Sequence, residues 1–248
     1  MNATERDAIT APAVGLVIYN TSSNCLNFYS GSNWHETCGS ISLPAGYPNG
    51  SVFCASGATA VVDVTNPTTG KIWMDRNLGA SQAATSRTDA NSYGDLYQWG
   101  RRSDGHQCRT SGVTSILSSV DQPAHGDFIL STSDWRSSQN TNLWQGVNGV
   151  NNPCPSGYRL PSETELNAER LSWSSNNSTG AFDSPLKFTV AGDRDDNTAS
   201  LNYVGNHGFY WSSTVSSTNS IPVIFSVSYQ SMAPHARAYG FSVRCLKD

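Results

Sequence analysis

The chain has 248 residues, of which 37% are hydrophobic and 14% charged, and its formal net charge is −4. This composition is typical of a folded protein with one large domain and a small one, and its negative charge argues against nucleic acid or anionic membranes as main partners. No run approaches the roughly 18 apolar residues of a membrane helix, and the polar start Met1-Asn2-Ala3-Thr4 lacks the apolar core of a signal peptide, so we expect no membrane insertion.

Residues 1–40 are predicted to form a small β-hairpin connector module. Residues 15–21 are typical of a strand and turn, and the segment between Cys25 and Cys38 favours a hairpin whose strands bring the two sulfurs together. The module is similar to short segments that precede the heads of phage tail fibres and bacterial surface proteins. We therefore expect it to form a homo-oligomer or to dock on a carrier.

Residues 41–70 are predicted to be a linker that holds the first strands. Turn-forming residues at 43–50 indicate a loop, and residues 60–64 indicate a strand. The main domain is then expected over residues 71–248, with residues 71–74 as its first strand.

Helix signals are few in the main domain. Ser162 and Glu165 have the spacing of a capping box, which predicts a helix from there to about residue 171 or 173. A second helix is expected over residues 80–88, and the Ser/Asn-rich residues 172–180 are expected to be an exposed loop.

Residues 215–239 have an unusual composition, because they contain no Lys, Glu, Asp or Trp. Two segments that contain aromatic residues, 210–214 (YWSST) and 240–245 (GFSVRC), bracket them. Residues 221–230 alternate with the period of a half-buried strand, which puts Pro222 and Ile224 on a solvent face. The alternative is an ordinary edge strand, where Pro and exposed Ser are common.

Several motifs carry a resemblance to a known family. They are residues 70–80 (GKIWMDRNLGA), 94–101 (GDLYQWGR), 154–162 (CPSGYRLPS) and the two bracketing segments. In this order they resemble the Fibrobacter succinogenes major paralogous domain, which is C-type-lectin-like and related to formylglycine-generating enzymes. The resemblance implies an α+β, C-type-lectin-like fold with mixed antiparallel sheets, few helices and long loops, preceded here by the small β-rich N-terminal module.

Similar domains serve as variable proteins of diversity-generating retroelements in phages and bacteria, where template adenines are randomised in the last lectin-like segment. Randomised Asn codons give access to the residue types that dominate residues 215–239, although Gln230 and Met232 lie outside that set. The resemblance implies a non-enzymatic receptor-binding or adhesion protein at an extracellular location, a cell surface or a virion. Its expected partner is a cell-surface protein or glycan.

A ligand-binding surface is expected where residue types suited to recognition gather near the C-terminus. Aromatic rings bury large areas at little rotamer cost, and Arg offers a planar fork of donors. The expected contact residues are Tyr203, Asn206, His207, Phe209, Ile221, Pro222, Ile224, His235, Arg237 and Tyr239.

Six cysteines without a Cys-x-x-Cys pair favour disulfides over a zinc site. Lectin-like folds commonly tie the loop before the helix to the last strand, so the resemblance implies a bond between Cys154 and Cys245. That leaves Cys54 with Cys108. Free buried thiols remain the alternative.

Other chemistry is weighed against this interpretation. A formylglycine-generating-like oxidoreductase needs a reactive cysteine, but Cys245 has the neighbours of a structural strand end, so no catalytic residue is expected. No cofactor is expected either, although Asp193, Asp195 and Asp196 cluster oxygen ligands and leave a structural calcium ion open. A purely structural cell-surface module is the third alternative.

The charged residues beside Trp99 have two interpretations. Arg101 and Asp95 lie in a family motif, which favours a role in holding loops through charge-assisted hydrogen bonds. Binding of an anion by residues 100–106 is the alternative.

Overall fold

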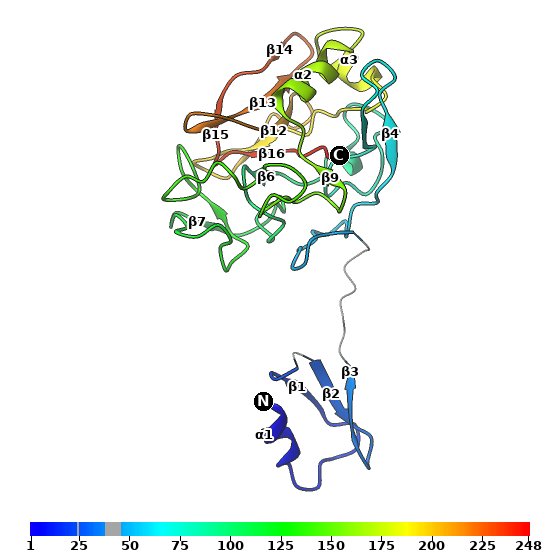
Figure 1. Ribbon diagram of the computed structural model, residues 1–248, viewed down its shortest axis with the longest axis vertical. Coiled ribbons are helices and arrows are strands. Elements are labelled where there is room, and N and C mark those ends of the chain that lie inside the picture. The colour runs from blue at the N-terminus through cyan, green and yellow to red at the C-terminus, as the bar shows by residue number, and fades with distance from the viewer. Residues whose placement is uncertain (24, 38–45) are drawn as a thin grey trace. The chain divides into compact units, whose positions relative to one another are not determined.

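The computed structural model describes residues 1–23, 25–37 and 46–248, which divide into two compact units, Met1–Ala45 and Gly46–Asp248 (Figure 1). The smaller unit contains α1 (Ala3–Asp7), β1 (Val17–Asn20), β2 (Cys25–Tyr29) and β3 (Trp34–Thr37). Within the described residues no helix has the length and apolar character needed to cross a membrane.

The larger unit consists mostly of short strands joined by long loops, with few helices. This architecture is α+β or β-rich, which is consistent with the α+β class that the resemblance implies. Its elements are β4 (Asp63–Thr65), β5 (Ile72–Met74), the 3-10 helix η1 (Ala90–Ser92), β6 (Tyr97–Gln98), β7 (Val113–Thr114), β8 (Phe128–Ile129), β9 (Tyr158–Arg159), α2 (Glu163–Leu171), α3 (Ser178–Asp183), β10 (Asp193–Arg194), β11 (Leu201–Asn202), β12 (Gly208–Ser216), β13 (Asn219–Phe225), β14 (Gln230–Ser231), β15 (His235–Ala236), β16 (Gly240–Phe241) and β17 (Leu246–Lys247).

In the smaller unit, β1, β2 and β3 form an antiparallel sheet that turns its polar side inward. Asn20 and Asn27 are buried, and the Arg6 side chain of α1 donates to Asn27 Oδ1 at 2.8 Å. The alternate positions Leu26 and Phe28 are 51% and 40% exposed. Among the described residues of this unit, none covers the apolar face of the sheet.

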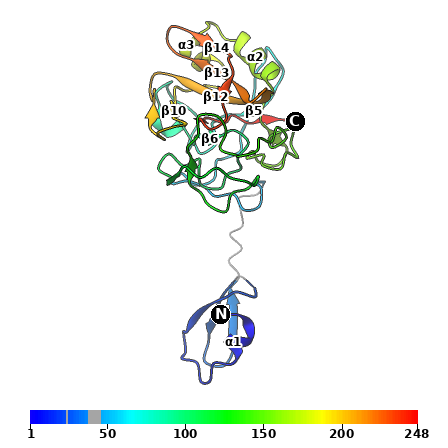
Figure 2. The same cartoon turned by 90° about the vertical axis from the view of Figure 1, so that its left-hand side faces the viewer.

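Three antiparallel sheets build the larger unit, in the orders β4-β5-β17-β9, β11-β10-β16-β6 and β12-β13-β14, with β15 also paired to β13. β7 and β8 form a separate parallel pair. The α2 helix packs against β12 and β13, and α2 and α3 lie beside this sheet in both views (Figures 1 and 2).

The β12–β13 hairpin is buried on both faces, which contradicts the half-buried strand with solvent-facing Pro222 and Ile224. On one face of the hairpin, Trp211 and Ile224 pack in a core cluster with Phe241. On the other face, Val223 packs in a second core cluster. Burying each large apolar side chain contributes about 1.5–3 kcal/mol, so both faces stabilise the fold.

β13 is also a central strand rather than an edge strand. It pairs with β12 on one side, and on the other with β15 at Asn219 and Ser220 and with β14 at Ile224 and Phe225. Proline has no backbone N–H to donate. Pro222 lies between the residues of β13 that pair with β15 and those that pair with β14, so neither pairing needs a hydrogen bond from it.

The capping box produces the helix that the sequence predicts. The Ser162 side chain accepts from the Glu165 amide, while Glu165 accepts from the Ser162 amide, and α2 ends at Leu171. Glu165 also accepts two hydrogen bonds from Arg159, both at 2.8 Å. These bonds hold the pKa of Glu165 at about 2.

One local prediction is wrong, and another is confirmed only in part. Residues 80–88 are not helical, because Gln82 and Thr85 donate to the carboxylate of Asp89, which folds the segment into a loop. Residues 172–177 form the expected loop, but residues 178–180 belong to the start of α3. The Asn177 side chain caps this helix by accepting from the amides of residues 179 and 180.

Disulfides Cys54–Cys108 and Cys154–Cys245 confirm two of the expected pairs. Cys154 and Cys245 are almost completely buried, at 1% and 0% exposure, and they lie just before β9 and β17, which pair with each other. The predicted Cys25–Cys38 bond includes a residue outside the described ranges.

Candidate functional site

A cavity of about 360 Å³ opens among the C-terminal strands of the larger unit. Its walls come from strands β10, β12, β13, β14, β15 and β16 and from the loops beside them. The lining residues are Asp193, Tyr203, His207, Phe209, Ile224, Tyr229, Ser231, His235, Tyr239 and Phe241.

The floor of the cavity follows from strand pairing. Phe209 of β12 lies opposite Ile224 of β13, and Phe241 of β16 stacks on Phe209 with ring centroids 5.0 Å apart. Phe209, Ile224 and Phe241 belong to one core cluster and are at most 7% exposed. The floor is therefore a rigid apolar surface.

A rim of more exposed aromatic rings surrounds this floor. Tyr203, held at a φ of 54°, accepts backbone hydrogen bonds from Asn206 and His207 and places its ring 4.6 Å from that of His207. Tyr229 approaches His207 from the β13–β14 connection, with ring centroids 5.8 Å apart, and Tyr239 stacks on the floor. These rings offer area for a partner at little cost in conformational entropy.

One carboxylate lines the cavity. Asp193 is 3% exposed, and its Oδ1 accepts no hydrogen bond from any residue that the structure describes. Burial, with a contribution from the neighbouring charges of Asp195 and Asp196, raises the pKa of Asp193 to about 7. The Nδ1 atom of His207 is likewise buried without a partner, and burial lowers the pKa of this imidazole.

The structure brings six of the ten expected contact residues together around this cavity. They are Tyr203, His207, Phe209, Ile224, His235 and Tyr239. Asn206 is exposed beside the cavity but does not line it, and half-buried Ile221 lies elsewhere on β13.

Two expected contact residues have structural positions instead. Pro222 is buried opposite Trp211. Arg237 is 0% exposed, lies 4.6 Å above the Trp99 ring and places Nη1 3.5 Å from the Asp134 carboxylate. The prediction of ligand contact is wrong for both, because long-range packing covers them.

Sequence reasoning missed Asp193, Tyr229, Ser231 and Phe241 as parts of this site. The alternation of residues 221–230 predicts one continuous strand with Tyr229 on the side opposite Pro222 and Ile224, but β13 ends at Phe225 and the chain turns there. The sequence suggests only a calcium ligand at Asp193, and its place in the cavity comes from the pairing of β10 with β16.

The acidic residues near the cavity are partly committed to local structure. Asp195 Oδ1 accepts from the amides of Asn197 and Thr198 and from the Thr198 hydroxyl. Over residues 1–23, 25–37 and 46–248, no group of three or more His, Cys, Asp or Glu side chains is arranged to hold a metal ion.

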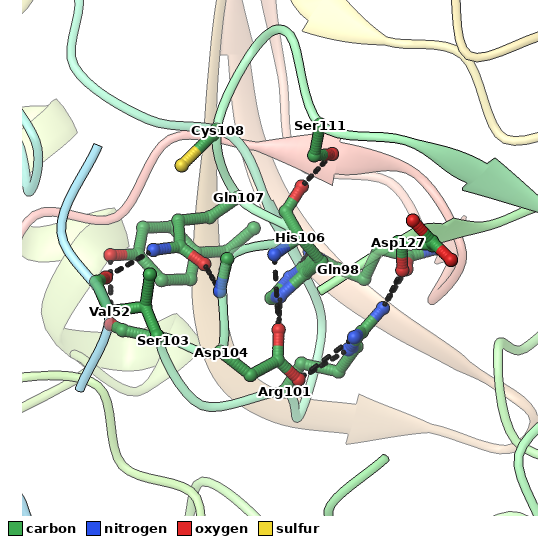
Figure 3. Close-up of polar contacts among 12 residues, drawn as sticks. Val52, Gln98, Arg101, Ser103, Asp104, His106, Gln107, Cys108, Ser111 and Asp127 are labelled. Carbon is green, nitrogen blue, oxygen red and sulfur yellow. Dashed lines mark hydrogen bonds and ion pairs between the residues drawn. The ribbon is translucent and has the colours of Figure 1, made fainter. Parts of the chain in front are cut away.

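The charged residues beside Trp99 form a buried network away from the cavity. Figure 3 shows Asp104 between Arg101, which donates to it at 2.8 Å, and His106, whose Nδ1 lies 2.6 Å from its other oxygen. Burial lowers the pKa of His106 to about 4, so the neutral ring donates to Asp104 and accepts from the Gln98 amide. Arg101 thus holds loops, as its motif position favours, with its charge compensated internally.

Comparison with known proteins supports a phage connection for one end of the chain. Residues 1–51 match a family described as a phage tail like trimerisation region. No curated protein and no solved structure matches the chain significantly. The match fits a homo-oligomeric, phage-related protein, and together with the disulfides it fits a virion or extracellular setting.

Proposed function

We propose that this chain is a non-enzymatic receptor-binding protein of a phage or phage-like particle. Its larger unit has a C-type-lectin-like fold and binds a cell-surface protein or glycan through the aromatic cavity. The observation that carries the proposal is that residues from separate segments, chosen for their recognition chemistry, converge on one concave site. The match of residues 1–51 to a phage tail like region supports the setting.

The proposal includes diversification of the site by a retroelement. Residues 215–239 have the composition expected of randomised codons, and Tyr229, Ser231, His235 and Tyr239 of this segment line the cavity. Other positions of the segment are fully buried and structural, as Arg237 is. Variation should therefore concentrate on the lining positions.

Gene sequences test the diversification. We expect an adjacent near-identical repeat, a reverse transcriptase gene, and sibling copies that differ at Tyr229, Ser231, His235 and Tyr239 while Val223 and Arg237 stay constant. Siblings that differ equally at lining and buried positions, or the absence of a template repeat, would refute this part of the proposal.

A direct experiment tests binding. Labelled full-length chain should bind the surface of susceptible bacterial cells, and Tyr229→Ser or Tyr203→Ser should reduce this binding at least tenfold without changing the melting temperature, because both rings are exposed at the rim. Ile116→Ser is the matched control, since Ile116 is 77% exposed but lies outside the cavity. Equal binding by all three variants would contradict the assignment of the site.

The oxidoreductase alternative is tested separately. The pairing of Cys245 with Cys154 supports a structural role for the cysteine that an enzymatic relative would need as a thiol. Thiol titration of the native protein should detect no reactive group at Cys245, and a titratable thiol there would favour the enzyme.

We also propose that the smaller unit trimerises through the uncovered face of its sheet. The register places Val17 opposite Phe28, and Phe28 next to His35, whose ring stacks on it at 5.1 Å. With Leu26, these residues form an apolar face opposite the one that carries Asn20 and Asn27. Burying such a face between copies of the chain removes apolar area from water, and the matching family is described by trimerisation.

Light scattering on the full chain tests this interface. Leu26→Glu should convert trimer to monomer, because three carboxylates would be forced together in an apolar contact. Ile116→Glu should leave the trimer intact, since it introduces the same charge at an exposed apolar position of the larger unit. A Leu26→Glu protein that remains trimeric would show that another surface joins the copies.

A further inference from the structure

The cavity has an acidic character that its aromatic walls alone do not explain. Of the described residues that line it, none is Lys or Arg, and one is the carboxylate Asp193. Asp193 is 3% exposed, and its Oδ1 is buried without a hydrogen-bond partner. A buried carboxylate oxygen without a donor is unfavourable, so it favours a partner that supplies one.

The surroundings of Asp193 also select the charge of that partner. Burial, and after it the negative charges of Asp195 and Asp196, disfavour ionisation of Asp193 when the cavity holds no ligand. A positive group in the cavity would relieve this repulsion. The imidazole of His207 does not supply the charge, because burial favours its neutral form.

The walls are suited to the same kind of group. The rings of Tyr203 and His207 lie 4.6 Å apart, and those of Tyr239 and Phe241 stack 5.5 Å apart. Aromatic faces attract ammonium and guanidinium groups, most strongly where water is excluded. A volume of about 360 Å³ also accommodates a side chain or a sugar ring.

We infer that the cavity recognises a cationic group, an ammonium or a guanidinium, which pairs with the Asp193 carboxylate between the aromatic rings. This inference rests on the proposed ligand-binding function and specifies the chemistry of the ligand. A neutral group of the same shape would contact the aromatic walls but would leave the negative charge of Asp193 without a positive partner.

Matched small molecules test the inference on the full chain at pH 7, where the amine of glucosamine is mainly protonated. Binding of Nα-acetyl-lysine methylamide, Nα-acetyl-arginine methylamide and glucosamine is measured by NMR titration against the neutral analogues Nα-acetyl-norleucine methylamide and N-acetylglucosamine. We expect at least one cation to bind tenfold or more tightly than its neutral analogue. Preference for the amino acids or for glucosamine tells whether the cation belongs to a protein or to a glycan.

The variant Asp193→Asn keeps the side-chain shape and removes the charge. It should abolish the preference for the cation while leaving the weak binding of the neutral analogue unchanged. A second measurement uses the parent protein, in which the ¹³C resonance of the Asp193 carboxyl should shift when the cation binds. Equal affinity for cation and neutral analogue, or an unmoved Asp193 resonance, would overturn the inference.

Three further outcomes test this inference separately from the proposed function. A chain that binds cells through Tyr229 and Tyr203 but rejects every cationic probe keeps the proposed function and overturns the inference. Calcium ions that displace the probes and shift the Asp193 resonance would also overturn it, because the carboxylate would then serve a metal. Failure of cell binding with intact cation binding would instead refute the proposed receptor role.

Discussion

The Cys154–Cys245 bond should supply a large part of the stability of the larger unit. The two cysteines are 91 positions apart, so in the chain-entropy description the bond lowers the free energy of the folded state relative to the unfolded one by about 4.6 kcal/mol at 25 °C. The bond is also buried in the apolar cluster that supports the cavity, and its loss leaves a small void that adds on the order of 1 kcal/mol. The double variant Cys154→Ala/Cys245→Ala should therefore lose about 5–6 kcal/mol.

Urea denaturation followed by circular dichroism measures this loss. The matched control is Cys54→Ala/Cys108→Ala, in which a separation of 54 positions gives an entropic contribution of about 4.2 kcal/mol at a half-buried site. For a unit of this size, each kcal/mol lowers the melting temperature by about 2–4 °C, so the buried pair should cost 10 °C or more. Equal stability of the parent and the Cys154→Ala/Cys245→Ala variant would refute the reasoning, as would a greater loss in the control.

Two further predictions concern ionic contacts. Arg237→Met should destabilise the larger unit by about 3–5 kcal/mol in thermal melts, because Asp134, 5% exposed, would lose its ionic partner, and Arg237→Met/Asp134→Leu should recover part of that loss. Unchanged stability in the single variant would contradict the packing assigned to Arg237. For Glu165, the lowered pKa stabilises the fold above its ordinary pKa of about 4.5, and this contribution is lost as the pH falls toward 2. In Glu165→Gln, the free energy of unfolding should therefore fall by about 1 kcal/mol less between pH 5 and pH 2 than in the parent protein, after allowance for solvent screening. An equal fall in both proteins would refute the role of Arg159.

Local signals in the sequence were sufficient for several elements. The capping box of Ser162 and Glu165 fixes the start of α2, because its hydrogen bonds join residues only three positions apart. Strand β5 and the hairpin of β2 and β3 also lie where their residue patterns place them. The motif resemblance gave the Cys154–Cys245 pairing, which local patterns alone leave open.

Contacts between distant segments decided which side of each strand is covered. The period of residues 221–225 predicts a strand, but it does not reveal that side chains pack on both faces and that two further strands border β13. In the smaller unit, too, the strand pattern does not reveal which face of the sheet is covered. There α1 covers the polar side and leaves Leu26 and Phe28 exposed.

The sequence by itself determined which chemistry the chain carries near its C-terminus, namely aromatic rings and imidazoles in a segment without Lys, Glu, Asp or Trp. Only the tertiary structure decided which of these groups form a site. It buried Arg237 against Trp99 and brought Asp193 to the cavity wall. The physical reason is that residue type is local, whereas burial and the presence of a hydrogen-bond partner depend on strands that pair across more than 40 positions of the chain.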